Sequence, residues 1–181
     1  MRILIALGTR PEIIKLGPVY LALSQIENVQ PDVFWTGQHE ELANGLFDLF
    51  KMEVAHHAVH ILEEPGLAGK FGLMNQQIEQ KLRGNAYDWI VVQGDTMTAT
   101  AAATAGFLNH VPVAHVEAGL RSGDLQSPWP EEFDRRVISL LAARHFAPTA
   151  VSRNNLLREG VPLEQIVVTG NTGVDALLYV L

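Results

Sequence analysis

The sequence has no cysteine and a deficit of positive charge. Its 181 residues include 13 Lys and Arg against 20 Asp and Glu, a formal net charge of -7. The absence of cysteine excludes disulfides and thiol chemistry, and the acidic balance argues against a nucleic-acid partner. No apolar run approaches the roughly 20 residues of a membrane span, and the apolar stretch 1–7 is too short for a signal peptide. We therefore expect a cytoplasmic protein without a membrane partner.

Short apolar runs alternate with helical patterns along the chain. The runs predict strands at 2–7, 32–36, 54–62, 89–92, 112–116, 145–147 and 166–169. Helices are expected at 40–50, 67–82, 97–108, 130–144 and 152–159, with a further helix after the first strand that Gly17 and Pro18 should kink or restart. This alternation predicts an α/β fold, a doubly wound parallel sheet of about seven strands with helices on both faces.

The last residues form a separate feature. Val174, Leu177, Leu178 and Leu181 follow a helical spacing, which predicts an amphipathic helix whose apolar face needs a partner. The pattern reaches Leu181 without a glycine or polar cap. We expect residues 1–170 to form one domain and residues 171–181 to begin a connection to something larger.

Acidic residues follow two of the predicted central strands. Asp95 follows the run 89–92 within Gln-Gly-Asp-Thr, and Glu117 follows the run 112–116. In an open α/β sheet, ligands bind outside the carboxyl ends of the strands, so both are candidate site residues. Asp95 could instead cap the helix that opens at Thr96. Glu131 lies in a first helical turn, where an acid also interacts well with the helix dipole.

A glycine turn after the first strand is a candidate anion site. Gly8 leads into a helix whose free N–H groups and dipole would suit a phosphate or carboxylate. Arg10 and Lys15 would add two cations. Two further glycines needed for a dinucleotide fingerprint are missing. The alternative interpretation is a tight turn with a surface Arg and Lys.

Several polar residues follow or lie within the second and third predicted strands. Gln38 and His39 end the second strand and could line the crevice or be ordinary loop residues. His56 and His60 have the spacing of a helical zinc pair, but in a strand His57 would point away from the other two. No carboxylate motif accompanies them, so we predict no metal site.

The chain resembles the amino-terminal domain of the non-hydrolysing UDP-N-acetylglucosamine 2-epimerases. The matching motifs run from one end to the other: GTRPEIIK (8–15), TGQH (36–39), QGDT (93–96), HVEAGLRS (115–122), PEE with Arg135 (130–135), HFAPT (145–149) and VTGNTGVDAL (168–177). One departure is Asp134, which stands where the family usually has Asn.

The resemblance implies one Rossmann-like half of a two-domain glycosyltransferase-B-type enzyme, without the second, UDP-binding domain. It implies an isomerase of cell-wall polysaccharide biosynthesis that uses no cofactor and forms a homodimer. Proton transfer would fall to Asp95, Glu117 and Glu131, and contact with UDP-N-acetylglucosamine to Arg10, Lys15, Gln38 and His39. Gln38 resembles a contact for a second, activating nucleotide sugar.

The sequence is also compatible with other functions. The chain could be a catalytic half that is weakly active or inactive alone, because an interdomain cleft would have only one wall. It could instead be a binding or dimerisation module that uses its last helix to recruit a partner. A third alternative is half of a hydrolysing epimerase or of a glycosyltransferase.

Overall fold

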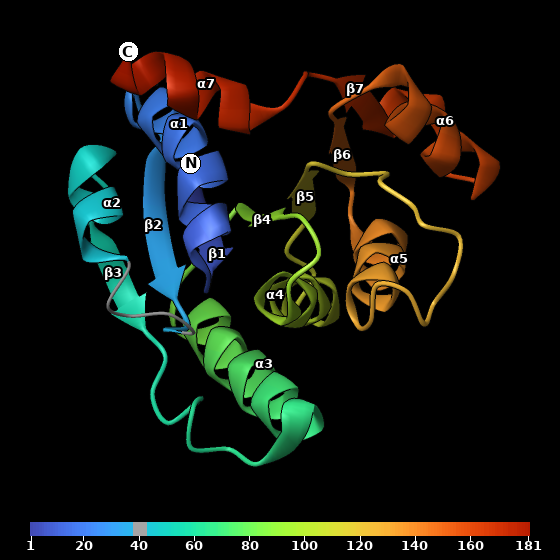
Figure 1. Ribbon diagram of the computed structural model, residues 1–181. Helices are drawn as coiled ribbons and strands as arrows, with labels where there is room; N and C mark the ends of the chain where they lie inside the picture. Colours follow the sequence, from blue (N-terminus) through green and yellow to red (C-terminus); the bar gives the residue numbers. More distant parts are fainter. Residues whose placement is uncertain (38–42) are drawn as a thin grey trace.

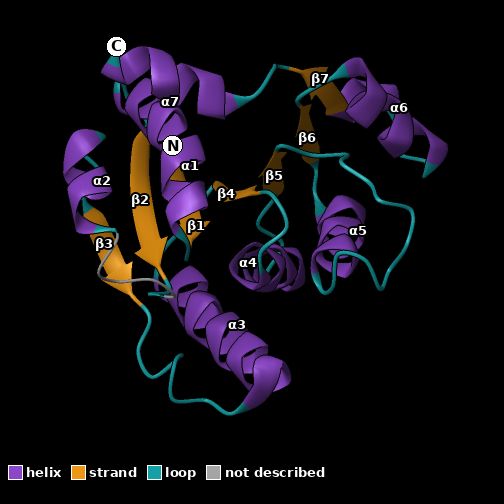
Figure 2. Cartoon of the chain, in the orientation of Figure 1, coloured by secondary structure: helices purple, strands orange, loops and turns teal. Residues whose placement is uncertain are grey.

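The computed structural model describes residues 1–37 and 43–181. Its strands are β1 (Arg2–Leu7), β2 (Gln30–Trp35), β3 (Val54–His57), β4 (Trp89–Gln93), β5 (Val113–Val116), β6 (Arg144–Ala147) and β7 (Ile166–Val168). Its helices are α1 (Arg10–Ser24), α2 (Asn44–Leu49), α3 (Gly66–Gly84), α4 (Met97–Leu108), α5 (Glu131–Leu141), α6 (Ala150–Arg158) and α7 (Thr172–Val180), with a 3₁₀ turn at Leu163–Gln165. Strands and helices alternate along the chain (Figure 2).

The described strands form one sheet of seven, in the order β3-β2-β1-β4-β5-β6-β7. Every neighbouring pair is parallel. The order reverses between β1 and β4, so the chain winds outward from the centre in both directions, as predicted. This reversal is the switch point at which ligands usually bind in such sheets.

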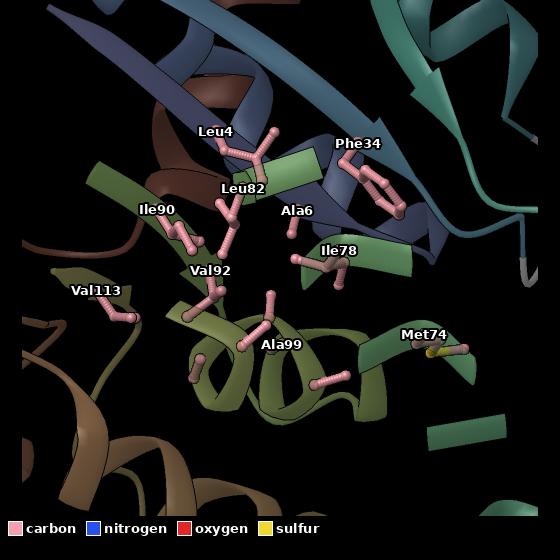
Figure 3. Packing of buried hydrophobic residues seen from close by; sticks show 14 of the residues in the cluster. Leu4, Ala6, Phe34, Met74, Ile78, Leu82, Ile90, Val92, Ala99 and Val113 are labelled. Carbon is pink, nitrogen blue, oxygen red and sulfur yellow. The ribbon is translucent and has the colours of Figure 1, made fainter. Parts of the chain in front are cut away.

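Helices cover both faces of the sheet, and successive residues of β1 face opposite ways. Leu4 and Ala6 pack with α3, α4 and part of α5, through residues such as Ile78. Ile5 and Leu7 pack with α1 and α2. Figure 1 shows α3, α4 and α5 together on one side of the sheet and α7 beside α1. Figure 3 shows the first of these clusters, where strand residues meet α3 and α4.

Some element boundaries differ from the predictions. The third strand ends at His57 rather than at residue 62. His60 has a positive φ of 62°, so an extended strand could not have continued through it to residue 62. The predicted helix 130–144 ends at Leu141, and Arg144 already begins β6. Helix α1 continues through Pro18 without a break.

The close fit of α1 on its neighbours depends on Gly17. A Cβ at this position would lie 2.3 Å from the Phe50 ring, so only glycine leaves room for that ring. Phe50 is 1% exposed and also stacks on Tyr179 of α7. Within the described residues, no helix has the length and apolar content required to cross a membrane.

Candidate active site

The carboxyl ends of the strands form the edge on which the candidate site lies. Because the strands are parallel, the segments that follow β1, β4, β5 and β7 emerge on the same edge. Gln93, the last residue of β4, is opposite Val116, the last residue of β5. A Cβ added to Gly94 would lie 3.7 Å from Glu117 Oε2. The turn that carries Asp95 therefore lies against the Glu117 carboxylate.

Three donors from different elements hold Glu117. Lys15 Nζ of α1 and Gln93 Nε2 of β4 each lie 2.6 Å from Oε2. Asn171 Nδ2, just before α7, lies 3.2 Å from Oε1. The side chain is 11% exposed. The structure thus brings together Lys15 and Glu117, which are distant in the sequence but were both predicted to be site residues.

The backbone of Glu117 is strained. Its φ of 64° is left-handed, and a non-glycine residue in that region costs on the order of 1–3 kcal/mol. Such a conformation persists only where the surroundings hold it, and it is enriched at functional sites. The three donors provide that support, which favours a functional role over a simple turn.

The glycine turn after β1 is occupied by the chain's own carboxylate. Glu12 Oε2 accepts hydrogen bonds from the N–H groups of Gly8 (3.0 Å) and Thr9 (2.8 Å) and from the Thr9 hydroxyl (2.8 Å). Burial raises the pKa of Glu12, while the bonds from Thr96, Gly8 and Thr9 act to lower it. The prediction that these N–H groups are free for an anion is therefore wrong for Gly8 and Thr9.

Glu12 also joins two turns of the edge. Thr96 donates its hydroxyl hydrogen to Glu12 Oε1 at 2.7 Å and accepts from the Ala99 N–H at 3.0 Å. Thr96 is thus the N-cap of α4, and the alternative that Asp95 caps this helix is wrong. The carboxylate of Asp95 is left for other contacts.

Asp95 pairs with Arg135 of α5, and its side chain is 28% exposed. The neighbouring Asp134 is 4% exposed and accepts a hydrogen bond from the Thr100 hydroxyl at 2.6 Å. Burial raises the pKa of Asp134 to about 6; the Thr100 bond lowers it, and the charges of Asp95 and Glu131 raise it. Asp95, Glu131 and Asp134 therefore form one electrostatically coupled group, with Arg135 as the cation paired with Asp95.

Glu131 and Glu132, adjacent in the first turn of α5, lie in different environments. Glu132 is fully buried and bonded to Ser122 N–H (3.0 Å) and to Arg136 (3.2 Å). Burial opposes its ionisation, but these donors with Gly123 and Arg135 hold the pKa of Glu132 below its ordinary value. Glu131, the first residue of α5, has a buried Oε2 without a hydrogen-bond partner in the described part of the chain. Glu132 thus anchors the loop that contains Ser122 and Gly123.

A buried histidine that was not singled out supports the same edge. His115 of β5 is 1% exposed, and its Nε2 lies 2.7 Å from the Gly94 carbonyl oxygen. Burial lowers the pKa of His115 to about 3, so the imidazole is neutral near pH 7 and its Nε2 donates to Gly94. His115 therefore fixes the turn before Asp95. Its place in a strand next to Glu117 was the available sequence signal.

Of the remaining predicted residues, the structure describes Arg10. Arg10 is exposed at the first position of α1, on the same edge as Lys15. Gln38 and His39 lie outside the described residues.

The histidines of the third strand have other partners. His56 Nε2 is 3.0 Å from the Tyr87 hydroxyl, and His60 pairs with Glu63. Among residues 1–37 and 43–181, no group of three potential metal ligands is assembled.

Most of the chain matches a known protein family. The family model described as UDP-N-acetylglucosamine 2-epimerase matches residues 21–181. A Yersinia pestis protein named UDP-N-acetylglucosamine 2-epimerase is 44% identical over 180 residues, which cover 99% of this chain and 48% of the relative. The chain thus spans about half the length of the curated relatives it matches.

Solved structures resemble this chain in fold as well as in sequence. The Neisseria meningitidis UDP-GlcNAc 2-epimerase bound to UDP-GlcNAc aligns with a TM-score of 0.94 and 40% identity, over 98% of this chain and 49% of that one. The Methanocaldococcus jannaschii UDP-GlcNAc 2-epimerase in complex with UDP-GlcNAc and UDP aligns with a TM-score of 0.91 and 39% identity, over 98% and 49%. The chain has the Rossmann-like fold of one half of these glycosyltransferase-B-type proteins.

Proposed function

The chain belongs to the UDP-N-acetylglucosamine 2-epimerase family, and we propose that it is the catalytic half of an enzyme that interconverts UDP-N-acetylglucosamine and UDP-N-acetylmannosamine. The observation that carries the proposal is the strained Glu117 held by Lys15, Gln93 and Asn171. Two relatives with this fold are described as bound to UDP-GlcNAc. The substrate is thus a nucleotide sugar whose C2 centre is inverted.

The chemistry starts from a difficulty at C2. The proton there is not acidic, so direct removal followed by return to the other face is slow. Elimination avoids this problem: a carboxylate takes the C2 proton, the C1–O bond breaks, UDP leaves and a C1–C2 double bond forms. In the second step UDP re-forms the C1–O bond while an acid returns a proton to the opposite face of C2. The two steps together interconvert the epimers without a redox change.

The residues of the edge match the needs of these steps. An elimination requires a base and an acid at C2 and positive charge near the leaving diphosphate. Asp95, Glu117 and Glu131 supply the carboxylates, and Arg10 with Lys15 supplies the cations. Within the described residues, Glu131 Oε2 has no hydrogen-bond partner, and this supports its assignment to proton transfer. Gln38 and His39 remain candidates for substrate contact.

We propose that the chain alone is inactive or weakly active. Its edge forms one wall of a cleft, and the relatives have about twice its length. The test is a chimera in which the remaining half of the Yersinia pestis relative follows Leu181. UDP-N-acetylglucosamine is added, and formation of UDP-N-acetylmannosamine is followed by chromatography. The chimera should turn over, and Glu117→Gln in the chimera should not.

The same assay separates the alternatives. Release of free UDP and N-acetylmannosamine would identify a hydrolysing enzyme. The exposed apolar residues of α7, with Leu177 57% and Leu178 65% exposed, favour the binding-module alternative. A tight complex with the second half, but no turnover in the complex or the chimera, would support that module and reject the catalytic proposal.

A further inference from the structure

We propose that Asn171 is a positioning residue that makes the orientation of Glu117 depend on helix α7. The inference rests on the proposed function and deepens it, since it assigns a control point to the same site. Asn171 lies immediately before α7, and α7 leads toward the part of the relatives that this chain does not match. The site would thus respond to the placement of the second half of the protein.

One amide group performs two tasks at this point. Asn171 Oδ1 accepts the Gly173 N–H at 2.8 Å and so caps α7. Asn171 Nδ2 donates to Glu117 Oε1 at 3.2 Å. Serine or aspartate could replace the capping oxygen, but neither supplies an N–H donor. The second bond therefore needs the amide, and the two tasks can be separated by substitution.

The two oxygens of Glu117 are held in different ways. Lys15 and Gln93, which belong to α1 and the sheet, both contact Oε2. Among the described residues, only Asn171 donates to Oε1. With its left-handed backbone, Glu117 has no regular secondary structure to orient it. Loss of the Asn171 bond would leave the carboxylate free to rotate about the oxygen that Lys15 and Gln93 hold.

Helix α7 is attached to the domain along one face only. Ala176 is 4% exposed, and the Tyr179 ring stacks on Phe50 at 5.6 Å. On the other side Val174 and Leu178 are 57% and 65% exposed. A segment that covers this apolar face would shift α7 or hold it in place. The first turn of α7 would transmit that change to Asn171, which caps the helix.

The first experiment is NMR on the 181-residue chain and needs no activity. The Asn171 side-chain NH₂ signals should move in Glu117→Gln. A glutamine there must turn its oxygen toward Lys15 and Gln93, so its own NH₂ would face Asn171. The Asn171 signals should also move in Tyr179→Ala, which loosens α7, but not in Val180→Ala on its exposed side. Unchanged signals in Glu117→Gln or in Tyr179→Ala would overturn the proposal.

The second experiment is kinetic and uses the chimera. Asn171→Ser keeps a capping oxygen, but its hydroxyl lies one bond nearer the backbone than the amide nitrogen and should not reach Glu117 Oε1, so kcat should fall by about 10- to 100-fold, as expected for a lost hydrogen bond to a charged group. KM should change less than about twofold, because the bond orients a reacting group rather than binding substrate. Asn171→Asp should be slower still, because it places a second carboxylate beside Glu117. Asn154→Ser, an exposed matched change on α6, should leave both parameters unchanged.

The outcomes distinguish the two proposals. Wild-type kcat in Asn171→Ser, with no turnover in Glu117→Gln, would reject the role of Asn171 and leave the proposed function standing. A rise in KM with unchanged kcat would also reject it. If the unsubstituted chimera shows no turnover, the proposed function fails, and the NMR signals of Asn171 alone decide whether α7 controls the Glu117 carboxylate.

Discussion

Substitution of Asp134 by Asn should stabilise the protein at neutral and alkaline pH but have little effect near pH 4. The carboxyl group is 4% exposed and its pKa is raised from 3.8 to about 6, chiefly by burial. A folded-state pKa above the unfolded value means that the folded protein holds its proton longer. The stability that this group contributes is therefore fully present below pH 3.8 and lost as the pH rises through about 6.

The size of the change in stability follows from the shift in the pKa of Asp134. A shift from 3.8 to about 6 corresponds to a loss of about 3 kcal/mol at pH 8. Asparagine carries no charge and keeps an oxygen for the Thr100 hydroxyl. The variant should thus be more stable than the wild type by about 3 kcal/mol at pH 8, and by less than about 1 kcal/mol at pH 4.

Urea unfolding of the wild type and Asp134→Asn at matched pH values from 4 to 8 provides the test. For a domain of this size, the gain at pH 8 corresponds to a rise in Tm of about 6–12 °C. Asp48→Asn removes an exposed carboxylate on α2 and should give a flat difference across the range. The reasoning would be refuted if Asp134→Asn and the wild type differed in free energy of unfolding by the same amount at every pH, or if the variant were less stable at pH 8.

Three further predictions concern the same edge. Thr96→Val removes the cap of α4 and a partner of the buried Glu12, and should cost about 2–3 kcal/mol in urea unfolding, while Thr96→Ser costs under about 1 kcal/mol. Gly8→Ala places a Cβ 2.1 Å from a threonine hydroxyl and should destabilise by over about 2 kcal/mol, whereas Gly45→Ala, with open space around it, should be neutral or better. His115→Phe should weaken the protein at pH 8 by about 1–3 kcal/mol, because the Gly94 carbonyl loses its donor. That deficit should shrink as the pH falls from 6.5 toward about 3, since the wild-type imidazole loses stability in that window; a constant deficit would contradict this account.

The order and type of the elements were predictable because the local signals agree with the fold. Each strand is a short apolar run closed by a turn, and each helix has its own pattern, so the alternation predicts a parallel sheet. The third strand itself was predicted, but its end was placed too late, because the left-handed backbone at His60 leaves no signal in the apolar pattern. The predicted end of α5 was also too late. Leu141 and Arg144 both fit a helical pattern, but Arg144 pairs with β5 as the first residue of β6.

The site was predictable only in part. Topology places residues that follow parallel strands on one edge, which is why Asp95, Glu117 and Lys15 could be assembled from sequence. Hydrogen-bond partners are a matter of side-chain geometry, and the sequence does not specify them. The capture of the Gly8 turn by Glu12 and the burial of Glu132 were therefore missed.

The carboxylates of the edge occupy unlike surroundings, and the proposed reaction needs that difference. Glu117 contacts an ammonium group and two amides, so its negative charge is compensated within the chain. Asp134 lies among acids and holds a proton up to about pH 6. An elimination and re-addition requires one group that accepts a proton and another that returns one, and groups in matched environments would compete for the same role. Asp134 bonds to the Thr100 hydroxyl and is 4% exposed, so its carboxyl group is buried behind the edge rather than open to a ligand.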